Sequence, residues 1–438
     1  MSTISIPGSK YAQPSDSVAG ARANAKTRTV TVFSLCFCLV FFQSLLSYPL
    51  YLCIGSEFCI AIEDASGGPQ YMWRAYVLTF IAFATLVVLY RVLSTKRRVE
   101  NFQYRTFVLA SHATYVKAWF VTAAIVVLNC SILFKQAGYR LPLLSGMSLD
   151  ATQYLLYRNG LSEGMNPSIA NFNAHLLVPM LVFLSFFCIR RNAIRFRLGS
   201  VLLLLLAACF ALNRSFLPVS IMISFFSFVA CRELPIRNLS KMAMGIVVLG
   251  VVSLALVVYS TKSSLTIAGQ KMSDRLVHGQ WLGMPMYLYY FEDYKITPKT
   301  FVHPKIRSVL AMEVPPTPGR ELMEYYNPAS AQNGTAGTIP TFFIGEAYAV
   351  GGWLAVGISV VYVSFVLWGF SFAFDMLPKN HITCCLYGWV AYKVSAGLVC
   401  GISAFLVSAL TAVLLTLMVY VFVYDSHVRS HRIEKNEL

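Results

Sequence analysis

The sequence predicts an all-α polytopic membrane protein with about ten transmembrane helices, and three observations carry that prediction. Of the 438 residues, 57% are hydrophobic and only 12% are charged, and the mean hydropathy is +0.62. Apolar runs of about 18 or more residues recur along the chain, and each is long enough to cross a hydrocarbon core of ~30 Å. Polar and apolar residues do not alternate within these runs, which favours helices over a barrel, because backbone groups in lipid must find partners within their own segment.

The apolar runs locate the predicted spans along the chain. They cover about residues 30–54, 72–93, 116–135, 173–189, 198–212, 216–231, 242–261, 350–374, 382–399 and 403–424. Short clusters of Lys and Arg fall on every second connection, as the positive-inside rule requires of cytoplasmic loops. The same rule accounts for the net charge of +16, so no nucleic-acid partner is predicted. It also predicts that both tails, 1–29 and 425–438, are cytoplasmic, and the polar, Ser-rich 1–29 is expected to be disordered.

Two connections on the external side, about 136–172 and 262–349, are far longer than the others. Neither has the basic character of a cytoplasmic loop, and the larger one is rich in Tyr, Trp, Pro and Gly. Long loops without strong periodicity are usually functional. We therefore expect residues 30–424 to form a single catalytic domain whose site lies on the external face.

Several arginines on the external side indicate an anionic partner. Arg214 lies in "ALNRSFLPV", a short turn between two apolar runs, where a charge is costly and therefore points to function; an arginine that snorkels from the turn is the alternative. Arg320 follows Pro-Pro-Thr-Pro-Gly, a stiff turn that would hold it in place. A group of guanidinium ions can clamp a diphosphate, although any single loop arginine can also be a solvated charge. The further loop arginines are Arg140, Arg158, Arg275 and Arg307.

Aromatic and acid–base candidates lie in the same loops. Tyrosines such as Tyr325 and Tyr326 can stack on sugar rings and bond their hydroxyls, or they can belong to an interfacial aromatic belt. Glu346 lies in the apolar stretch "FFIGEAYAVGGW", where it is a candidate for proton abstraction. A carboxylate that bonds a helix N-terminus or an arginine is the equal alternative for it. His278 and His303 are the histidine candidates.

The sequence contains none of the usual nucleotide or metal motifs. It has no Walker loop, Rossmann glycine fingerprint, HExxH, GxSxG or Asp-x-Asp, and its eleven cysteines show no metal-ligand spacing. No cofactor and no metal are therefore predicted. Cys53 and Cys59 flank the first external loop, and whether they form a disulfide is left open. An enzyme of this kind would take a substrate that is already on the outer face and lipid-linked.

Three stretches resemble Wzy-type O-antigen and oligosaccharide repeat-unit polymerases. "GTIPTFFIGEAYAVGGWLAVGISVVY" is similar to the late segment of that family, in which Gly-Glu and a Tyr precede a glycine-rich helix start. "PPTPGRELMEYYNPASAQNG" looks like the loop that leads into it, particularly in polymerases of the enterobacterial-common-antigen kind. "LNRSF" resembles a short external turn with arginine at a comparable place.

The resemblance implies a metal-independent glycosyltransferase of the GT-C type in the bacterial inner membrane, with its active site on the periplasmic side. It would transfer a glycan from undecaprenyl diphosphate to the non-reducing end of another lipid-linked repeat unit. A chain-length regulator and a flippase are the protein partners that this family implies. Under this hypothesis, Arg214 and Arg320 hold the diphosphate, Glu346 or His278 assists the acceptor hydroxyl, and the remaining substrate contacts come from Arg158, Arg275, Arg307, Tyr325, Tyr326 and Asn333.

Two other activities are alternatives. An O-antigen ligase would move a finished glycan onto lipid A core, and in that case His278 or His303 would be the discriminating residue. A transporter or flippase for the lipid-linked oligosaccharide is the third hypothesis. The absence of a visible internal repeat weighs against it, since many transporters are built from duplicated halves. We also expect no charged residues deep within the spans, which weighs against it as well.

Overall fold

The structure is a computed structural model that describes residues 44–54, 57–95, 112–142, 164–189, 191–210, 216–231, 283–293, 310–312, 316–332 and 338–406, together with short pieces within 145–161 and 409–417. Within these residues every regular element is a helix, and no strand occurs. The predicted all-helical class is confirmed for this part of the chain. The GT-C plan stays a prediction.

The chain forms short helices before and between the long ones. In chain order the helices are α3 (Ser47–Ile54), α4 (Glu57–Ala65), α5 (Pro69–Thr95), α7 (His112–Gln136), α10 (Pro167–Phe172), the π-helix η1 (Asn173–Leu177), α11 (Val178–Phe183), the π-helix η2 (Leu184–Cys188), α12 (Ala193–Cys209), α13 (Phe216–Cys231), α16 (Gly283–Asp293), α18 (Pro318–Tyr326), α19 (Pro328–Gln332), α20 (Phe343–Met376) and α21 (His381–Leu398). A further apolar helix runs from Ile402 to Leu414.

Four of the described helices are long and apolar enough to cross a membrane. They are Pro69–Ser94, His112–Gln136, Ile169–Phe186 and Phe343–Met376, which correspond to four of the predicted spans. Helices α12, α13 and α21 lie where three more spans are expected, but they are shorter or less apolar. The expected span 242–261 and most of 30–54 lie outside the described residues. The count of ten therefore stays a prediction.

The long helices expose large apolar side chains on one face. Phe80 and Val88 of α5 are more than half exposed, as are Leu354 and Ile358 of α20. The opposite faces of the same helices carry buried residues such as Leu86. An apolar surface of this extent is unstable in water and fits a helix that faces lipid. The described helices thus support a membrane-embedded protein.

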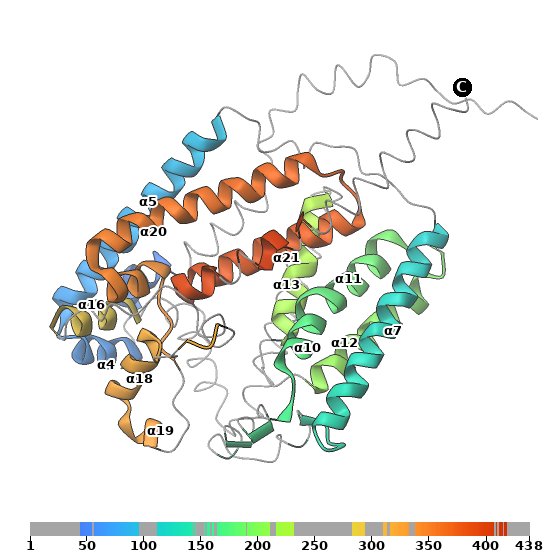
Figure 1. Ribbon diagram of the computed structural model, residues 1–438, viewed down its shortest axis with the longest axis horizontal. Coiled ribbons are helices and arrows are strands. Elements are labelled where there is room, and N and C mark those ends of the chain that lie inside the picture. The colour runs from blue at the N-terminus through green and yellow to red at the C-terminus, as the bar shows by residue number, and fades with distance from the viewer. Residues whose placement is uncertain are drawn as a thin grey trace, which may run out of the picture.

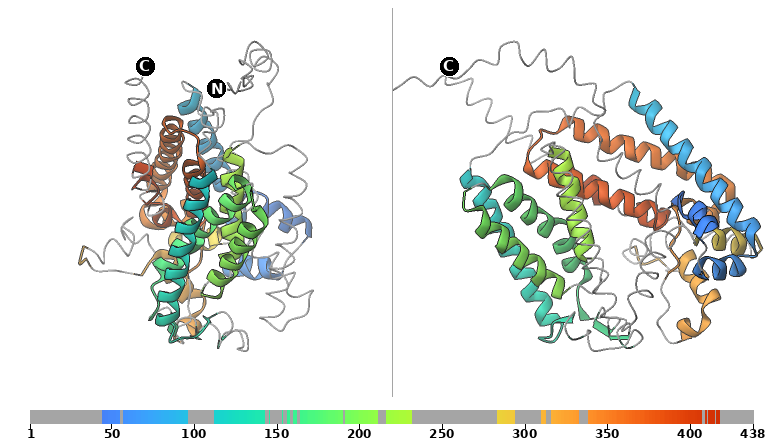
Figure 2. Two further views of the ribbon diagram at one scale, coloured as in Figure 1. Left: turned by 90° about the vertical axis from the view of Figure 1, so that its right-hand side faces the viewer. Right: turned by 180° about the vertical axis from the view of Figure 1, so that it is seen from behind.

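The described helices form two hydrophobic clusters. The first cluster joins α5, α13, α16, α20 and α21, and the second joins α7, α11, α12 and the π-helices. Figure 1 shows α5 and α20 on one side of the molecule, α7 and α12 on the other, and α13 with α21 between them. The view from behind in Figure 2 shows the same order, with α5 along the outer edge beside α20. Helices α13 and α21 pack along each other extensively at this centre.

Helix α20 begins earlier than the sequence indicates. The predicted span starts near 350, whereas the helix starts at Phe343 and is broken by a kink at Gly351 and Gly352. Every residue from Phe343 to Val350 is buried. This first segment is therefore surrounded by protein on all sides, as expected for a helix that is apolar all round. Beyond the kink, α20 turns an exposed apolar face outward.

Candidate functional site

Helix α18 carries Arg320, the predicted diphosphate ligand. Thr317 caps this helix, since its hydroxyl accepts from the backbone N–H of Arg320 at 3.3 Å, and Pro318 occupies the first turn. A side chain on Gly319 would collide with the Tyr287 hydroxyl and the Ile339 carbonyl, so the Pro-Gly-Arg stretch needs glycine to pack this closely. The Arg320 Nε donates to Glu324 Oε1 at 2.5 Å, and both side chains are partly exposed. Arg320 is thus held at the surface by its own helix.

Tyrosines join α16 to α18. The rings of Tyr290 and Tyr325 meet edge to face with centroids 4.8 Å apart, and Tyr325 meets Tyr326 in the same way at 5.0 Å. Tyr325 is 45% exposed, so one face of this group is open to a ligand. Tyr287 is buried beneath it and donates to the Ile339 carbonyl at 3.3 Å. Burial raises the pKa of the Tyr287 phenol well above its usual range, and the nearby Glu346 carboxylate raises it further, so this phenol stays a neutral donor.

Glu346 lies in the first turn of α20 and is 7% exposed. Its Oε1 accepts from the Ser403 hydroxyl at 2.6 Å, and its Oε2 accepts from the Ser403 backbone N–H at 3.0 Å. Ser403 belongs to the first turn of the helix that starts at Ile402, so the carboxylate caps a helix N-terminus. Gly401, with φ of 124°, passes so close to Glu346 that a side chain there would overlap the carboxylate. This is the structural role that the sequence left open beside the catalytic one.

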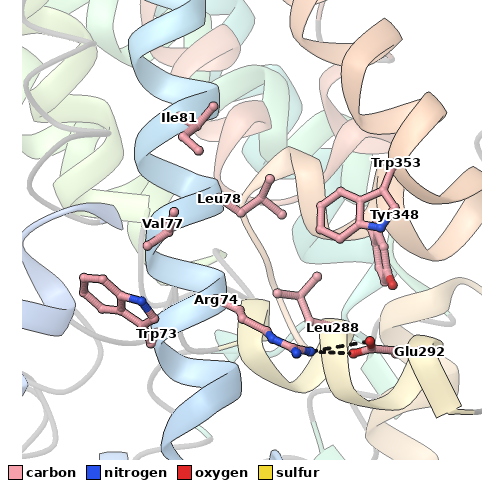
Figure 3. A pocket seen from close by; sticks show the side chains of 9 residues that line it. All are labelled: Trp73, Arg74, Val77, Leu78, Ile81, Leu288, Glu292, Tyr348 and Trp353. Carbon is pink, nitrogen blue, oxygen red and sulfur yellow. Dashed lines mark hydrogen bonds and ion pairs between the residues drawn. The ribbon is translucent and has the colours of Figure 1, made fainter.

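A groove lies on the outer surface between α5, α16 and α20 (Figure 3). Its volume is about 490 Å³. One wall is a single face of α5, since its lining residues recur three and four positions apart. Helix α16 supplies the floor, and α20 supplies the opposite wall. The lining residues are Trp73, Arg74, Val77, Leu78, Ile81, Leu288, Glu292, Tyr348 and Trp353.

The groove is polar at one end, and aromatic and apolar side chains line the rest (Figure 3). Figure 3 shows Arg74 and Glu292 pointing toward each other at the lower end, with Val77, Leu78 and Ile81 above them on α5. The Arg74 Nη1 lies 3.3 Å from Glu292 Oε2, and the two side chains are 57% and 45% exposed. Tyr348 and Trp353 face the groove from α20 with ring centroids 4.9 Å apart. This arrangement fits an amphiphile with an anionic head and an apolar chain.

The kink in α20 shapes the groove. Gly352 has φ of 62° and ψ of −153°, a conformation that is essentially restricted to glycine. The helix changes direction there, so that Tyr348 before the kink and Trp353 after it come together at the same wall. The backbone conformation of the Gly-Gly pair therefore determines where this wall of the groove lies.

The structure brings some of the predicted site residues together. Arg320, Tyr325 and Tyr326 share α18, and α18 contacts the α20 helix that carries Glu346. Arg140 is exposed just beyond the end of α7 and does not line the groove. Cys53 is a free, exposed thiol, and the Cys59 side chain is not among the described ones, so the disulfide between them stays open. The remaining candidates lie outside the described residues: Arg158, Arg214, Arg275, His278, His303, Arg307 and Asn333.

Sequence reasoning missed Arg74 and Lys393. Arg74 lies at the predicted external end of its span, where the positive-inside rule disfavours arginine just as it does at Arg214. Lys393 lies well inside the predicted span 382–399, so the expectation that no charged residue lies deep within the spans is wrong. An ionisable residue in such a place is a functional candidate by default. Both signals are present in the sequence.

Comparison with known proteins adds no relative. No family model matches the chain, and neither a curated protein nor a solved structure matches it. Among the described residues, no group of three or more His, Cys, Asp or Glu side chains could hold a metal ion.

Proposed function

We propose that this protein polymerises lipid-linked oligosaccharide repeat units at the periplasmic face of the bacterial inner membrane. A growing glycan leaves undecaprenyl diphosphate and joins the non-reducing end of a second lipid-linked unit. The bond between the anomeric carbon and the diphosphate oxygen breaks, and a bond to the acceptor oxygen forms. The acceptor proton passes to a base, and negative charge stays on the lipid diphosphate.

The groove beside α5 is the observation that carries this proposal. Its apolar wall of Val77, Leu78 and Ile81 belongs to a helix long enough to cross the membrane, which suits a prenyl chain. Its polar end offers a guanidinium at Arg74, which suits a phosphate. Tyr348 supplies an aromatic face next to that end, where the first sugar of a lipid-linked glycan would lie, and Trp353 lies beside it on the same wall.

Arg320 and the α16–α18 tyrosines extend the proposed site away from the membrane. Positive charge must stand ready where negative charge develops on the leaving diphosphate. Arg320 supplies it from a capped helix, and its partner Glu324 is exposed, so a more highly charged anion can replace that partner. Tyr325 offers an exposed ring for stacking on sugars further along the glycan.

The decisive experiment is polymerisation by the purified protein in nanodiscs with a defined undecaprenyl-diphosphate-linked repeat unit. We expect a ladder of products on a gel. Leu78→Trp should fill the groove and lower the rate, because the prenyl chain loses its place. Val88→Trp is the matched control, since Val88 is exposed on the same helix and does not line the groove.

Two outcomes would contradict the proposal at different points. A protein that is folded but makes no ladder from a competent substrate is not a polymerase of that unit. If the Leu78→Trp protein makes the same ladder as the wild type, the protein is a polymerase but the groove does not bind its substrate. In cells, loss of a polymerase leaves single repeat units on lipid A core, whereas loss of a ligase leaves none.

A transporter of lipid-linked oligosaccharide is the second candidate, and one observation favours it. Lys393 lies inside the membrane domain, where ionisable residues often mark a substrate path. A transporter would move the labelled substrate between leaflets of a proteoliposome without changing its length. Product length therefore separates the two functions.

A further inference from the structure

Lys393 is a charged residue within a buried helix. It lies five residues before the end of α21 at Leu398, or about 7.5 Å along the helix axis. Helices α13, α20 and α11 and the π-helix η1 all contact α21, and Lys393 itself is half-buried. An ionisable side chain in such a place is costly, so it calls for a partner or a function.

Lys393 lies at the seam between the two hydrophobic clusters. The neighbouring Tyr392 packs on the first cluster, and its ring lies 5.9 Å from the ring of His175. His175 belongs to η1, whose Ala174 and Leu177 are buried in the second cluster. Lys393 lies near His175 and near Cys400. Single π-helical turns inside α-helices occur frequently at functional sites.

The described surroundings of Lys393 lack a matching anion. In the described part of the chain, no hydrogen bond or ion pair joins Lys393 to a carboxylate. Glu346 also lies near Cys400, and its two oxygens accept from the Ser403 backbone N–H and hydroxyl. A half-buried ammonium is stabilised when an anion binds beside it.

We propose that Lys393 binds a phosphate group of a polyprenyl diphosphate substrate at this seam. This proposal rests on the proposed polymerase function and adds a second lipid-diphosphate site to it. Polymerisation joins two lipid-linked molecules, so the protein needs two places for a lipid diphosphate. The groove at Arg74 lies against α5 and α20, and the seam lies on the other side of α20, against α11 and α13. A lysine suits this task, because a compact ammonium on a flexible stem can follow a moving phosphate.

The test is direct binding of farnesyl diphosphate to the full-length protein in phosphatidylcholine nanodiscs, which requires no turnover. For Lys393→Met we expect the Kd of the seam site to rise roughly 10- to 100-fold, as loss of a charged hydrogen bond predicts. Lys393→Arg keeps the charge and should recover most of the affinity. Lys117→Met is the matched control, because Lys117 is exposed near the start of α7.

A second measurement uses the wild-type protein and does not depend on any variant folding. Farnesyl diphosphate should protect Lys393 from a small amine-acylating reagent, as read by mass spectrometry, whereas farnesol should not. Equal acylation with and without farnesyl diphosphate would overturn the proposal. So would an unchanged Kd in a folded Lys393→Met protein.

The two proposals fail separately. If farnesyl diphosphate binds and protects Lys393 but no polymer forms, the phosphate site is supported and the polymerase function is contradicted. If Lys393→Met polymerises with unchanged kcat and KM, the polymerase function is supported and the phosphate site at Lys393 is contradicted. Displacement of farnesyl diphosphate by phosphatidylglycerol at equal concentration would assign the seam to an ordinary lipid headgroup and overturn its assignment to the substrate.

Discussion

At the scale of single residues, Glu346 has two alternative roles in the sequence, and the structure shows the contact that one of them requires. Its apolar neighbours make it a candidate base, and a bond to a helix N-terminus is the alternative. The structure has that bond, but the capped helix starts at Ile402, more than 50 residues away in sequence. A long-range contact of this kind leaves no local pattern, so the sequence could not choose between the roles.

Glu346→Gln tests which role matters. A glutamine turns an N–H group toward one of the Ser403 donors, so we expect the free energy of unfolding to fall by about 2 kcal/mol. Ser403→Ala removes only the hydroxyl donor and should cost about 1 kcal/mol. Thermal unfolding in detergent measures both. If the turnover of Glu346→Gln falls by more than its folded fraction does, the carboxylate takes part in the chemistry.

Arg320 is a second residue whose role a variant can decide. Its exposed pair with Glu324 contributes at most about 0.5 kcal/mol to stability, so Arg320→Ala should fold normally. We expect polymerisation to fall roughly tenfold or more, and Arg320→Lys to recover only part, because lysine cannot bind two phosphate oxygens in one plane. Glu324→Gln serves as the control and should keep activity. Normal product from Arg320→Ala at normal expression would exclude the diphosphate clamp.

At the scale of elements, the sequence predicted the positions of the described helices well and their environments less well. Spans expected near 72–93 and 116–135 appear as α5 and α7. For α20 the expected start was seven residues late, because hydropathy cannot separate an apolar segment buried in protein from one that faces lipid. The exposed Arg74 and the half-buried Lys393 were missed because each lies within an apolar run, and the length and hydropathy of a run do not show what an individual charge inside it contacts.

The kink in α20 gives a prediction for this element. Gly352→Ala places a side chain in a conformation that costs about 1–3 kcal/mol, so we expect a lower unfolding temperature and a distorted groove wall. Gly369→Ala is the matched control, since it lies in the same helix with open space around it. Alanine there should be neutral or stabilising by roughly 0.5–1 kcal/mol. Equal unfolding temperatures for the two variants would show that the kink tolerates a side chain.

At the scale of the whole molecule, composition alone predicted a helical membrane protein. The helical class is confirmed for the described residues, and four of their helices, long and apolar enough to cross a membrane, support the membrane part. The grouping into two hydrophobic clusters could not be predicted, because it depends on which helices meet across hundreds of residues. The groove has the same origin: its walls come from α5, α16 and α20, which are far apart in the chain. Function at such a site is a property of the assembly of helices.

The Arg74–Glu292 pair has a consequence for how the groove would recognise its ligand. Two charges this exposed hold each other with at most about 1 kcal/mol, so the pair is easily exchanged. Glu292 then acts as a resident counter-ion that keeps the empty groove electrically neutral. An incoming phosphate replaces one anion with another and need not neutralise a bare cation. A neutral lipid has no anion to exchange for Glu292 and gains nothing at the polar end of the groove. The groove would therefore select charged amphiphiles from a bilayer whose other lipids have apolar chains of similar length.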